Sequence, residues 1–311
     1  MNIDDTLDPA DLLPAVDNVF ALAAQKSLAL ARDWEPKRGA PVFTERGKYT
    51  TRGWTEWTQG FQYGSIILAG EGSDDDALID LGREQTLDMM LPHVTHIGVH
   101  DHGFNNLSTY GNLLRLLNEG RIAGDHFQRT LYENAIAASG AVQAARWAKT
   151  SCGLGYVYSF NGPHSLFIDT MRTLRILVVA HQLGHVLMGE NDERINLLQR
   201  AIQHAQATSR YIVFHGDSPH TYDTRGRTAH EGTFNPNDGN FRSLATQQGY
   251  SPFSTWTRGL AWAMLGFAEQ LEFLATVEEE EFNGMGFSKT GVLRDFQTCA
   301  KQTCDHYIHD C

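Results

Sequence analysis

The chain has 311 residues, of which 41% are hydrophobic and 10% aromatic, enough to build a sizeable hydrophobic core. Its 25 Lys and Arg against 37 Asp and Glu give a formal net charge of −12, and no basic run marks a surface for nucleic acid. The start MNIDDTLDPADLLP lacks the basic and apolar regions of a secretion signal, and no stretch approaches the ~18 apolar residues that span a bilayer. We therefore expect a cytoplasmic globular protein that binds neither nucleic acid nor a membrane.

Apolar residues recur at helical spacing along the chain, and period-two alternation is almost absent, so the sequence predicts an all-α fold. A Gly-Ser-Asp signal at residues 72–74 is typical of a helix start, because its hydroxyl or carboxylate can accept hydrogen bonds from free backbone N–H groups. The predicted helices cover residues 12–31, 54–69, a segment after 74, 104–117, 127–149, 169–183, 192–211, 254–274 and 289–308.

Several predicted helices are joined in the same way, by a short turn that contains glycine and acidic residues. The turns LAGEGSDDD, LLNEGRIAGD and LMGENDERI each join an apolar helix to a more polar one. A recurring helical hairpin of this kind indicates a solenoid or a closed ring, with the apolar helices on the inside.

Four of the apolar helices follow segments rich in Trp, His, Asp or Arg: RGWTEWTQGF, GVHDHGF, YSFNGPHSLFID and QQGYSPFSTWTRGLAW. In a ring these segments share one opening, where helix N-termini favour an anionic ligand. Aromatic side chains beside them suit the apolar faces of a sugar ring. The pattern therefore indicates a carbohydrate acid as the ligand.

Four motifs in order resemble the unsaturated glucuronyl hydrolases and the related unsaturated rhamnogalacturonyl hydrolases. GVHDHGF resembles the His-Asp-x-Gly-Phe of that family, and FIDTMRTL resembles its Ile-Asp-x-Met-x-x-Leu. GRTAHEGTFNPNDG and QQGYSPFSTWTRGLAWAMLG resemble two further family segments. The resemblance implies a six-hairpin (α/α)6 barrel over residues 1–311, and we expect its C-terminal helices to be missing from this chain.

The resemblance also implies a role for individual residues. Asp169 matches the general acid and base, and Asp101 matches a second carboxylate that contacts substrate and tunes the first. The implied substrate contacts are His100, His230, Arg258, Trp54, Trp57, Trp256, Trp262 and Gln247. The implied reaction hydrates the C4=C5 double bond of a terminal unsaturated uronic acid on an oligosaccharide. It requires no metal and no cofactor.

A carboxyl group that both gives and takes a proton needs a raised pKa, so we expect one for Asp169. Without the motifs, Asp101 and Asp169 are interpreted as helix caps, His100 as a histidine paired with backbone carbonyls, and the tryptophans as core.

Departures from the family pattern, such as Gln62, Gln247 and Thr173, leave the sugar open. A saturated exo-β-glucuronidase, a sugar epimerase or isomerase and a non-catalytic sugar-binding protein stay as alternatives. An incomplete ring would expose apolar faces, so association into an oligomer also stays open.

Overall fold

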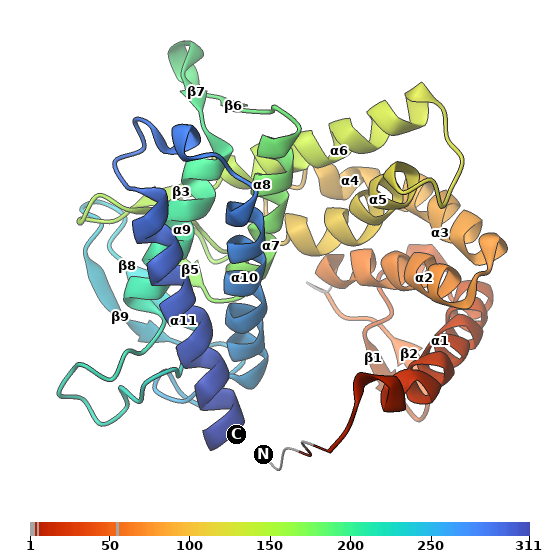
Figure 1. Ribbon diagram of the computed structural model, residues 1–311, viewed down its shortest axis with the longest axis horizontal. Helices are drawn as coiled ribbons and strands as arrows, with labels where there is room; N and C mark the ends of the chain where they lie inside the picture. The colour runs from red at the N-terminus through yellow and green to blue at the C-terminus, as the bar shows by residue number, and fades with distance from the viewer. Residues whose placement is uncertain (1–3, 5, 54–55) are drawn as a thin grey trace. The chain divides into compact units, whose positions relative to one another are not determined.

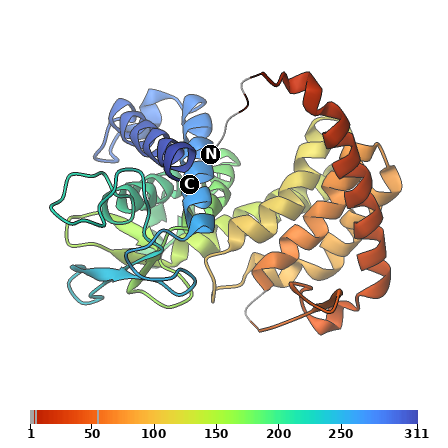
Figure 2. The same ribbon diagram turned by 90° about the horizontal axis from the view of Figure 1, so that it is seen from below.

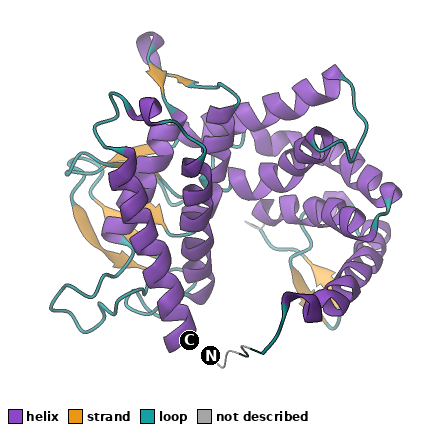
Figure 3. Ribbon diagram, in the orientation of Figure 1, coloured by secondary structure: helices purple, strands orange, loops and turns teal. Residues whose placement is uncertain are grey.

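The computed structural model describes residues 4, 6–53 and 56–311, and their contacts form two units. The C-terminal unit consists of Ile97–Asp101 and Gly140–Cys311, and the N-terminal unit consists of the chain up to His96 together with His102–Ser139. Figure 1 shows the elements of both, and Figure 3 shows that helices dominate the described residues.

The N-terminal unit is helical apart from one hairpin. Its elements are α1 (Leu13–Asp33), β1 (Phe43–Glu45), β2 (Lys48–Thr50), α2 (Gln59–Ser73), α3 (Asp76–Met89), α4 (Leu91–Val94), the π-helix η4 (Gly103–Gly111), α5 (Asn112–Asn118) and most of α6 (His126–Ala145). Buried polar groups tie three of them together: His93 of α4 bonds Gln59 of α2 at 2.7 Å and Asn105 of η4 at 3.1 Å. These bonds satisfy polar groups that would otherwise be costly to bury.

The C-terminal unit combines helices with short strands. Its elements are β3 (Trp147–Lys149), β4 (Gly155–Val157), β5 (Ser165–Phe167), α7 (Thr170–Thr173), α8 (Arg175–Gln182), β6 (Leu187–Met188), β7 (Arg194–Ile195), α9 (Leu197–Tyr211), β8 (Glu231–Phe234), β9 (Phe241–Ala245), α10 (Thr257–Ala275) and α11 (Lys289–Asp310). Strands β5, β8 and β9 form an antiparallel sheet with β8 in the middle. Helices α10 and α11 lie side by side, as Figures 1 and 2 show.

Close packing of α10 against α7 fixes the start of α7. A Cβ atom on Gly266 of α10 would lie 2.7 Å from the backbone carbonyl of Met171, so only glycine permits this approach. One turn away, Glu269 of α10 forms ion pairs with Arg172 at 3.3 Å and Arg175 at 2.9 Å. Helix α7, which begins just after Asp169, is therefore held by α10 through close backbone packing and through the ion pair of Arg172.

The predicted helices are found, with shifted ends. Helix α3 begins at Asp76 with Asp75 as its cap, whereas Asp74 ends α2 in a left-handed conformation, so the cap signal lies one residue later than predicted. The segment predicted as 54–69 is α2, which begins at Gln59. The region predicted as 104–117 is a π-helix followed by α5.

The short strands were not predicted. They contain two to five residues each in the described chain, too few for alternation to stand out in the sequence. The fold is thus mostly helical rather than entirely helical.

Candidate active site

The core of the candidate site is a buried pair, His100 and Asp169, both in the C-terminal unit. The Nε2 atom of His100 lies 3.1 Å from Oδ1 of Asp169, and the two residues are 1% and 8% exposed. Asp169 occupies the position before α7, yet its side chain makes no capping hydrogen bond. The helix-cap interpretation therefore fails for this carboxylate, which is directed to the histidine instead.

The backbone of His100 is also held in place. The Thr173 hydroxyl donates to the His100 carbonyl oxygen at 2.9 Å and in turn accepts from the Gln143 amide at 2.7 Å. Asp101, 6% exposed, has its Oδ1 3.8 Å from Nε2 of the same imidazole. One histidine ring thus faces both predicted carboxylates.

Aromatic rings enclose this histidine. Phe160 is stacked on the His100 ring with centroids 5.9 Å apart and an interplanar angle of 25°, and Phe167 meets the ring edge-on at 5.6 Å. Phe167 also contacts the ring of His230 at 4.7 Å. Apolar walls of this kind exclude water and strengthen the electrostatic interactions between the enclosed groups.

His230 presents one ring nitrogen that is already used and one that is not. Its Nδ1 accepts a hydrogen bond from the backbone N–H of Gln247 at 3.1 Å, so a neutral ring carries its proton on Nε2. That Nε2 is buried and has no hydrogen-bond partner among the described residues. It is therefore available as a donor to a bound ligand.

Trp256 and Arg258 complete the cluster at the start of α10. The Trp256 ring lies 4.4 Å from the His230 ring, and the Arg258 guanidinium lies 4.5 Å from the Trp256 ring centroid. Arg258 also donates to the side-chain oxygen of Gln248. An aromatic face, a histidine donor and a guanidinium together can hold a sugar that carries a carboxylate.

The charges in the site lower the pKa of Asp169 instead of raising it as predicted. Burial alone would raise this pKa, but His100, His230 and Arg258 outweigh burial and favour the carboxylate. Burial likewise opposes the charge on His100, but Asp101 and Asp169 outweigh it and raise the pKa of the imidazole. Both shifts favour an imidazolium facing a carboxylate.

The pKa of His230 moves the other way. Burial lowers it, and the carboxylates of Asp169 and Glu231 offset this only in part. A neutral ring agrees with the hydrogen bond that its Nδ1 accepts.

Six of the predicted site residues come together in the C-terminal unit: His100, Asp101, Asp169, His230, Trp256 and Arg258. Gln247 reaches this group through its backbone N–H. Trp262 is half-buried on α10, one turn beyond Arg258.

Two predicted residues remain, Trp57 and Trp54. Trp57 lies in the N-terminal unit, where its ring contacts Phe61 and Phe104. Trp54 lies outside the described residues.

Sequence reasoning missed Phe160, Phe167 and Arg146. The two phenylalanines lie within the segment YSFNGPHSLFID, but a phenylalanine gives no chemical signal that separates a site wall from core. Arg146 is 4% exposed and donates to the carbonyl oxygens of Tyr158 and Ser159 at 3.1 and 2.6 Å. A buried arginine at a helix end carries no motif.

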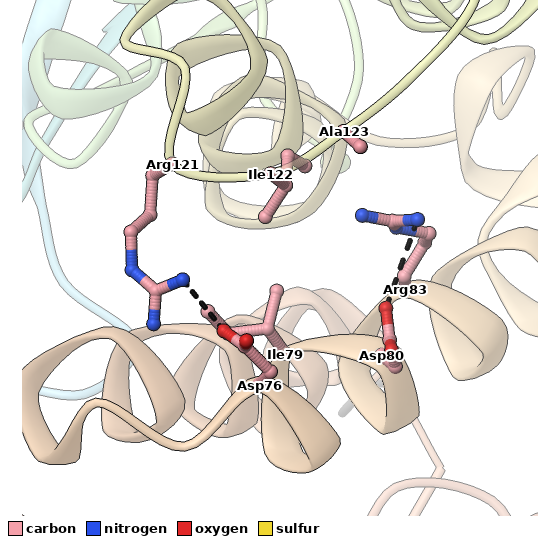
Figure 4. A pocket seen from close by; sticks show the side chains of 7 residues that line it. All are labelled: Asp76, Ile79, Asp80, Arg83, Arg121, Ile122 and Ala123. Atoms are coloured by element: carbon pink, nitrogen blue, oxygen red, sulfur yellow. Dashed lines mark hydrogen bonds and ion pairs between the residues drawn. The ribbon is translucent and has the colours of Figure 1, made fainter.

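A cavity of about 250 Å³ lies in the N-terminal unit (Figure 4). It is lined by Asp76, Ile79, Asp80, Arg83, Arg121, Ile122 and Ala123. Arg121 is paired with Asp76 at 2.6 Å, and Arg83 lies 3.7 Å from Asp80. Because each guanidinium already faces a carboxylate, this cavity is a poorer site for an acidic sugar than the cluster around Asp169.

No group of three or more histidine, cysteine or acidic side chains in the described residues is arranged to hold a metal ion. None of the helices in this part of the chain has the length and apolar character needed to cross a membrane.

Comparison with known proteins gives distant relatives of one kind. No protein-family model matches the chain. The chain is 28% identical to the unsaturated chondroitin disaccharide hydrolase of Streptococcus pyogenes serotype M1 over 91% of its own length and 64% of that relative. It is 27% identical to the unsaturated glucuronyl hydrolase of Bacillus sp. strain GL1 over 74% of its length and 55% of that relative. The chain thus spans less than two thirds of either relative.

Solved structures agree with the sequence matches. A crystal structure of an unsaturated glucuronyl hydrolase specific for heparin matches 95% of this chain and 67% of that chain, with a TM-score of 0.71 and 18% identity. The enzyme from Bacillus sp. GL1 matches with a TM-score of 0.60 and 18% identity. The fold is therefore the mostly helical fold of these glycoside hydrolases, over about two thirds of their length. In sequence, the chain is a distant homologue of unsaturated chondroitin disaccharide and unsaturated glucuronyl hydrolases, at 27–28% identity.

Proposed function

We propose that this protein hydrates the C4=C5 double bond of a terminal unsaturated uronic acid and so releases that sugar from an oligosaccharide. The observation that carries the proposal is the Asp169 carboxylate, held by His100 and influenced by the positive charge of Arg258. A relative from Streptococcus agalactiae has been solved as an Asp-to-Asn variant in complex with dGlcA-GalNAc6S, a ligand of the same class.

In this proposal the uronate binds at the start of α10. Its carboxylate pairs with the guanidinium of Arg258, and the free Nε2–H of His230 donates to a sugar oxygen. Trp256 supplies an aromatic surface beside both groups. Contacts with these three groups would hold the sugar in one orientation relative to Asp169.

Substrate binding also changes the proton affinity of Asp169. His100 and the guanidinium of Arg258 lower the pKa of Asp169 in the free protein, and the carboxylate of a bound uronate offsets the positive charge of Arg258. Burial then favours the neutral acid, and the proton on His100 can pass to Asp169 across the 3.1 Å hydrogen bond. This explains how a carboxylate that is ionised at rest becomes the acid when substrate is present.

The reaction then follows two proton transfers. Asp169 gives its proton to C4, and positive charge develops at C5. The resulting carboxylate takes a proton from water as the water oxygen bonds to C5. The product is an unstable hemiketal, which opens and releases the remaining saccharide. Asp101, whose Oδ1 lies 3.8 Å from Nε2 of His100, raises the pKa of the imidazole and so favours return of the proton to His100 when the cycle ends.

The finer description of the fold stays a prediction. A single (α/α)6 barrel over residues 1–311 agrees with helix pairs such as α10 and α11, which lie side by side. The cytoplasmic location likewise stays a prediction from the sequence.

The test is an ultraviolet assay on unsaturated disaccharides produced by polysaccharide lyases, in which hydration removes the absorbance of the conjugated double bond. We expect wild type to remove it and Asp169→Asn to lose at least about 100-fold in rate, the size of a general acid–base contribution. Asp295→Asn is the matched control, because Asp295 is a half-buried aspartate on α11 that accepts from Ser209 and has no role in the site.

The outcomes separate the candidate reactions. No loss of absorbance with folded wild type would refute the hydration proposal. Release of sugar from saturated glucuronides under the same conditions would support the exo-β-glucuronidase alternative. Equal activity of Asp169→Asn and wild type would refute the role assigned to Asp169.

A further inference from the structure

The carboxyl group of Glu231 is buried beside the site, and the mechanism above does not use it. Glu231 is 3% exposed and begins strand β8, where it pairs with Phe167 of β5. Its Oε1 accepts hydrogen bonds from the Ser165 hydroxyl at 2.6 Å and from the Asn161 side-chain amide at 3.1 Å. Burying a carboxyl group costs free energy unless hydrogen-bond donors such as these compensate for the lost water. The two donors are therefore what makes the buried position of Glu231 possible.

Both donors belong to one segment, residues 158–165, which we call the Phe160 loop. The loop closes on itself, because the Ser159 hydroxyl lies 2.6 Å from the Ser165 hydroxyl and accepts from the Asn161 N–H at 3.1 Å. At its N-terminal side, Arg146 donates to the Ser159 carbonyl oxygen. Glu231 is the acceptor that fastens the middle and the end of this loop to strand β8.

The loop carries Phe160, whose ring is stacked on His100. The orientation of the His100 ring depends on such contacts, because its Nε2 bonds Asp169 while its Nδ1 is buried without a hydrogen-bond partner among the described residues. One hydrogen bond fixes one ring atom and leaves rotation about that contact open. The stacked Phe160 and the edge-on Phe167 supply the remaining restraint.

We propose that Glu231 is a positioning residue: its Oε1 holds the Phe160 loop so that Phe160 keeps the His100 ring aligned with Asp169. The inference rests on the proposed function only in taking the His100 and Asp169 pair as the acid–base group. Glu231 acts here as a hydrogen-bond acceptor, and it acts through Phe160.

Two substitutions separate the acceptor from other roles. Glu231→Gln keeps an Oε1 acceptor for both donors, so we expect kcat within about threefold of wild type. Glu231→Ala leaves the Ser165 and Asn161 donors unsatisfied and frees the loop. We expect it to lower kcat by up to about 100-fold with little change in KM, since a small misplacement of a reacting group has an effect of that size.

The control is Thr233→Val on the same strand. Thr233 lies two residues along β8, and its side-chain hydroxyl bonds Ser243 of β9, whereas only its backbone pairs with Ser165. The valine substitution leaves that backbone pairing in place. We expect kcat to be unchanged. A fall in kcat for Glu231→Gln equal to that for Glu231→Ala would overturn the acceptor role.

A double-mutant cycle tests whether Glu231 acts through Phe160. Phe160→Leu removes the stacked ring and keeps an apolar side chain. If Glu231 works by holding Phe160, the double variant loses little more than either single variant, because the two changes break the same contact. Additive losses would refute the connection.

A readout that needs no activity is the NMR resonance of the His100 ring protons, assigned by comparison with His100→Gln. The stacked Phe160 ring shifts this resonance by its ring current. We expect the resonance to move in the same direction in Phe160→Leu and in Glu231→Ala. If Glu231→Ala does not fold, Asn161→Ala takes its place. Thr233→Val and Glu231→Gln should not move the resonance. An unmoved resonance in Glu231→Ala overturns the inference, whereas an inactive wild type overturns the proposed reaction and leaves this measurement to decide the role of Glu231.

Discussion

Gly266 is the point at which a single methyl group should disturb the candidate site from a distance. Its missing Cβ would lie 2.7 Å from the backbone carbon and oxygen of Met171, about 0.7 Å closer than the 3.4 Å of ordinary van der Waals contact. A backbone cannot rotate away as a flexible side chain can, so in Gly266→Ala helix α7 has to move. Because α7 begins directly after Asp169, the displacement reaches the carboxylate.

The expected size follows from two opposing effects. Overpacking costs about 1–3 kcal/mol, and replacing a helical glycine with alanine returns about 0.5–1 kcal/mol. We therefore expect Gly266→Ala to lower the free energy of unfolding by about 1–2 kcal/mol. A shift of Asp169 by a large fraction of an ångström should also lower kcat about 10- to 100-fold.

The assay combines urea unfolding with the ultraviolet rate measurement. Gly111→Ala is the control, because the Cβ there would meet the flexible side chain of Leu107 at 3.1 Å. We expect this control to keep the wild-type kcat. A Gly266→Ala protein with wild-type stability and wild-type kcat would refute the reasoning, since α7 and α10 would then accommodate a methyl group without displacing Asp169.

Three further predictions concern charge. The folded-state pKa of His100 lies above its ordinary value of 6.5. The pair with Asp169 therefore stabilises the fold fully below pH 6.5, and this stabilisation is lost as the pH rises through the folded pKa. We expect the urea midpoint of wild type to fall in alkali and that of His100→Gln to stay unchanged. Burial lowers the pKa of His204 to about 3, so stability present above pH 6.5 should decline as the pH falls toward that value, and His204→Asn should reduce this decline in the same titration. Arg258→Lys should raise KM for an unsaturated disaccharide about tenfold or more, because an ammonium cannot pair with a carboxylate through two parallel hydrogen bonds. An unchanged KM would contradict uronate binding at Arg258.

Helices could be predicted from the sequence because apolar spacing of 3.6 residues persists over many turns. The spacing holds over long segments such as α9 and α11, whose predicted and observed ends agree closely at the C-terminus of α9 and the N-terminus of α11. Strands β5 and β8 escaped prediction because three or four residues carry too little periodicity, and antiparallel pairing depends on a partner more than sixty residues away.

Residue types and their spacing establish which side chains are available for the chemistry, namely the aspartates, histidines, arginine and tryptophans of the four motifs. They also establish the helices that begin beside these side chains. Only the tertiary structure decided that His100 is held against Asp169, that both sit within aromatic walls, and that the pKa of Asp169 is lowered rather than raised. The physical reason is that residue types and local periodicity are properties of short stretches of chain. A pKa, by contrast, is set by burial and by charges brought together across 69 residues between His100 and Asp169, which no local pattern contains.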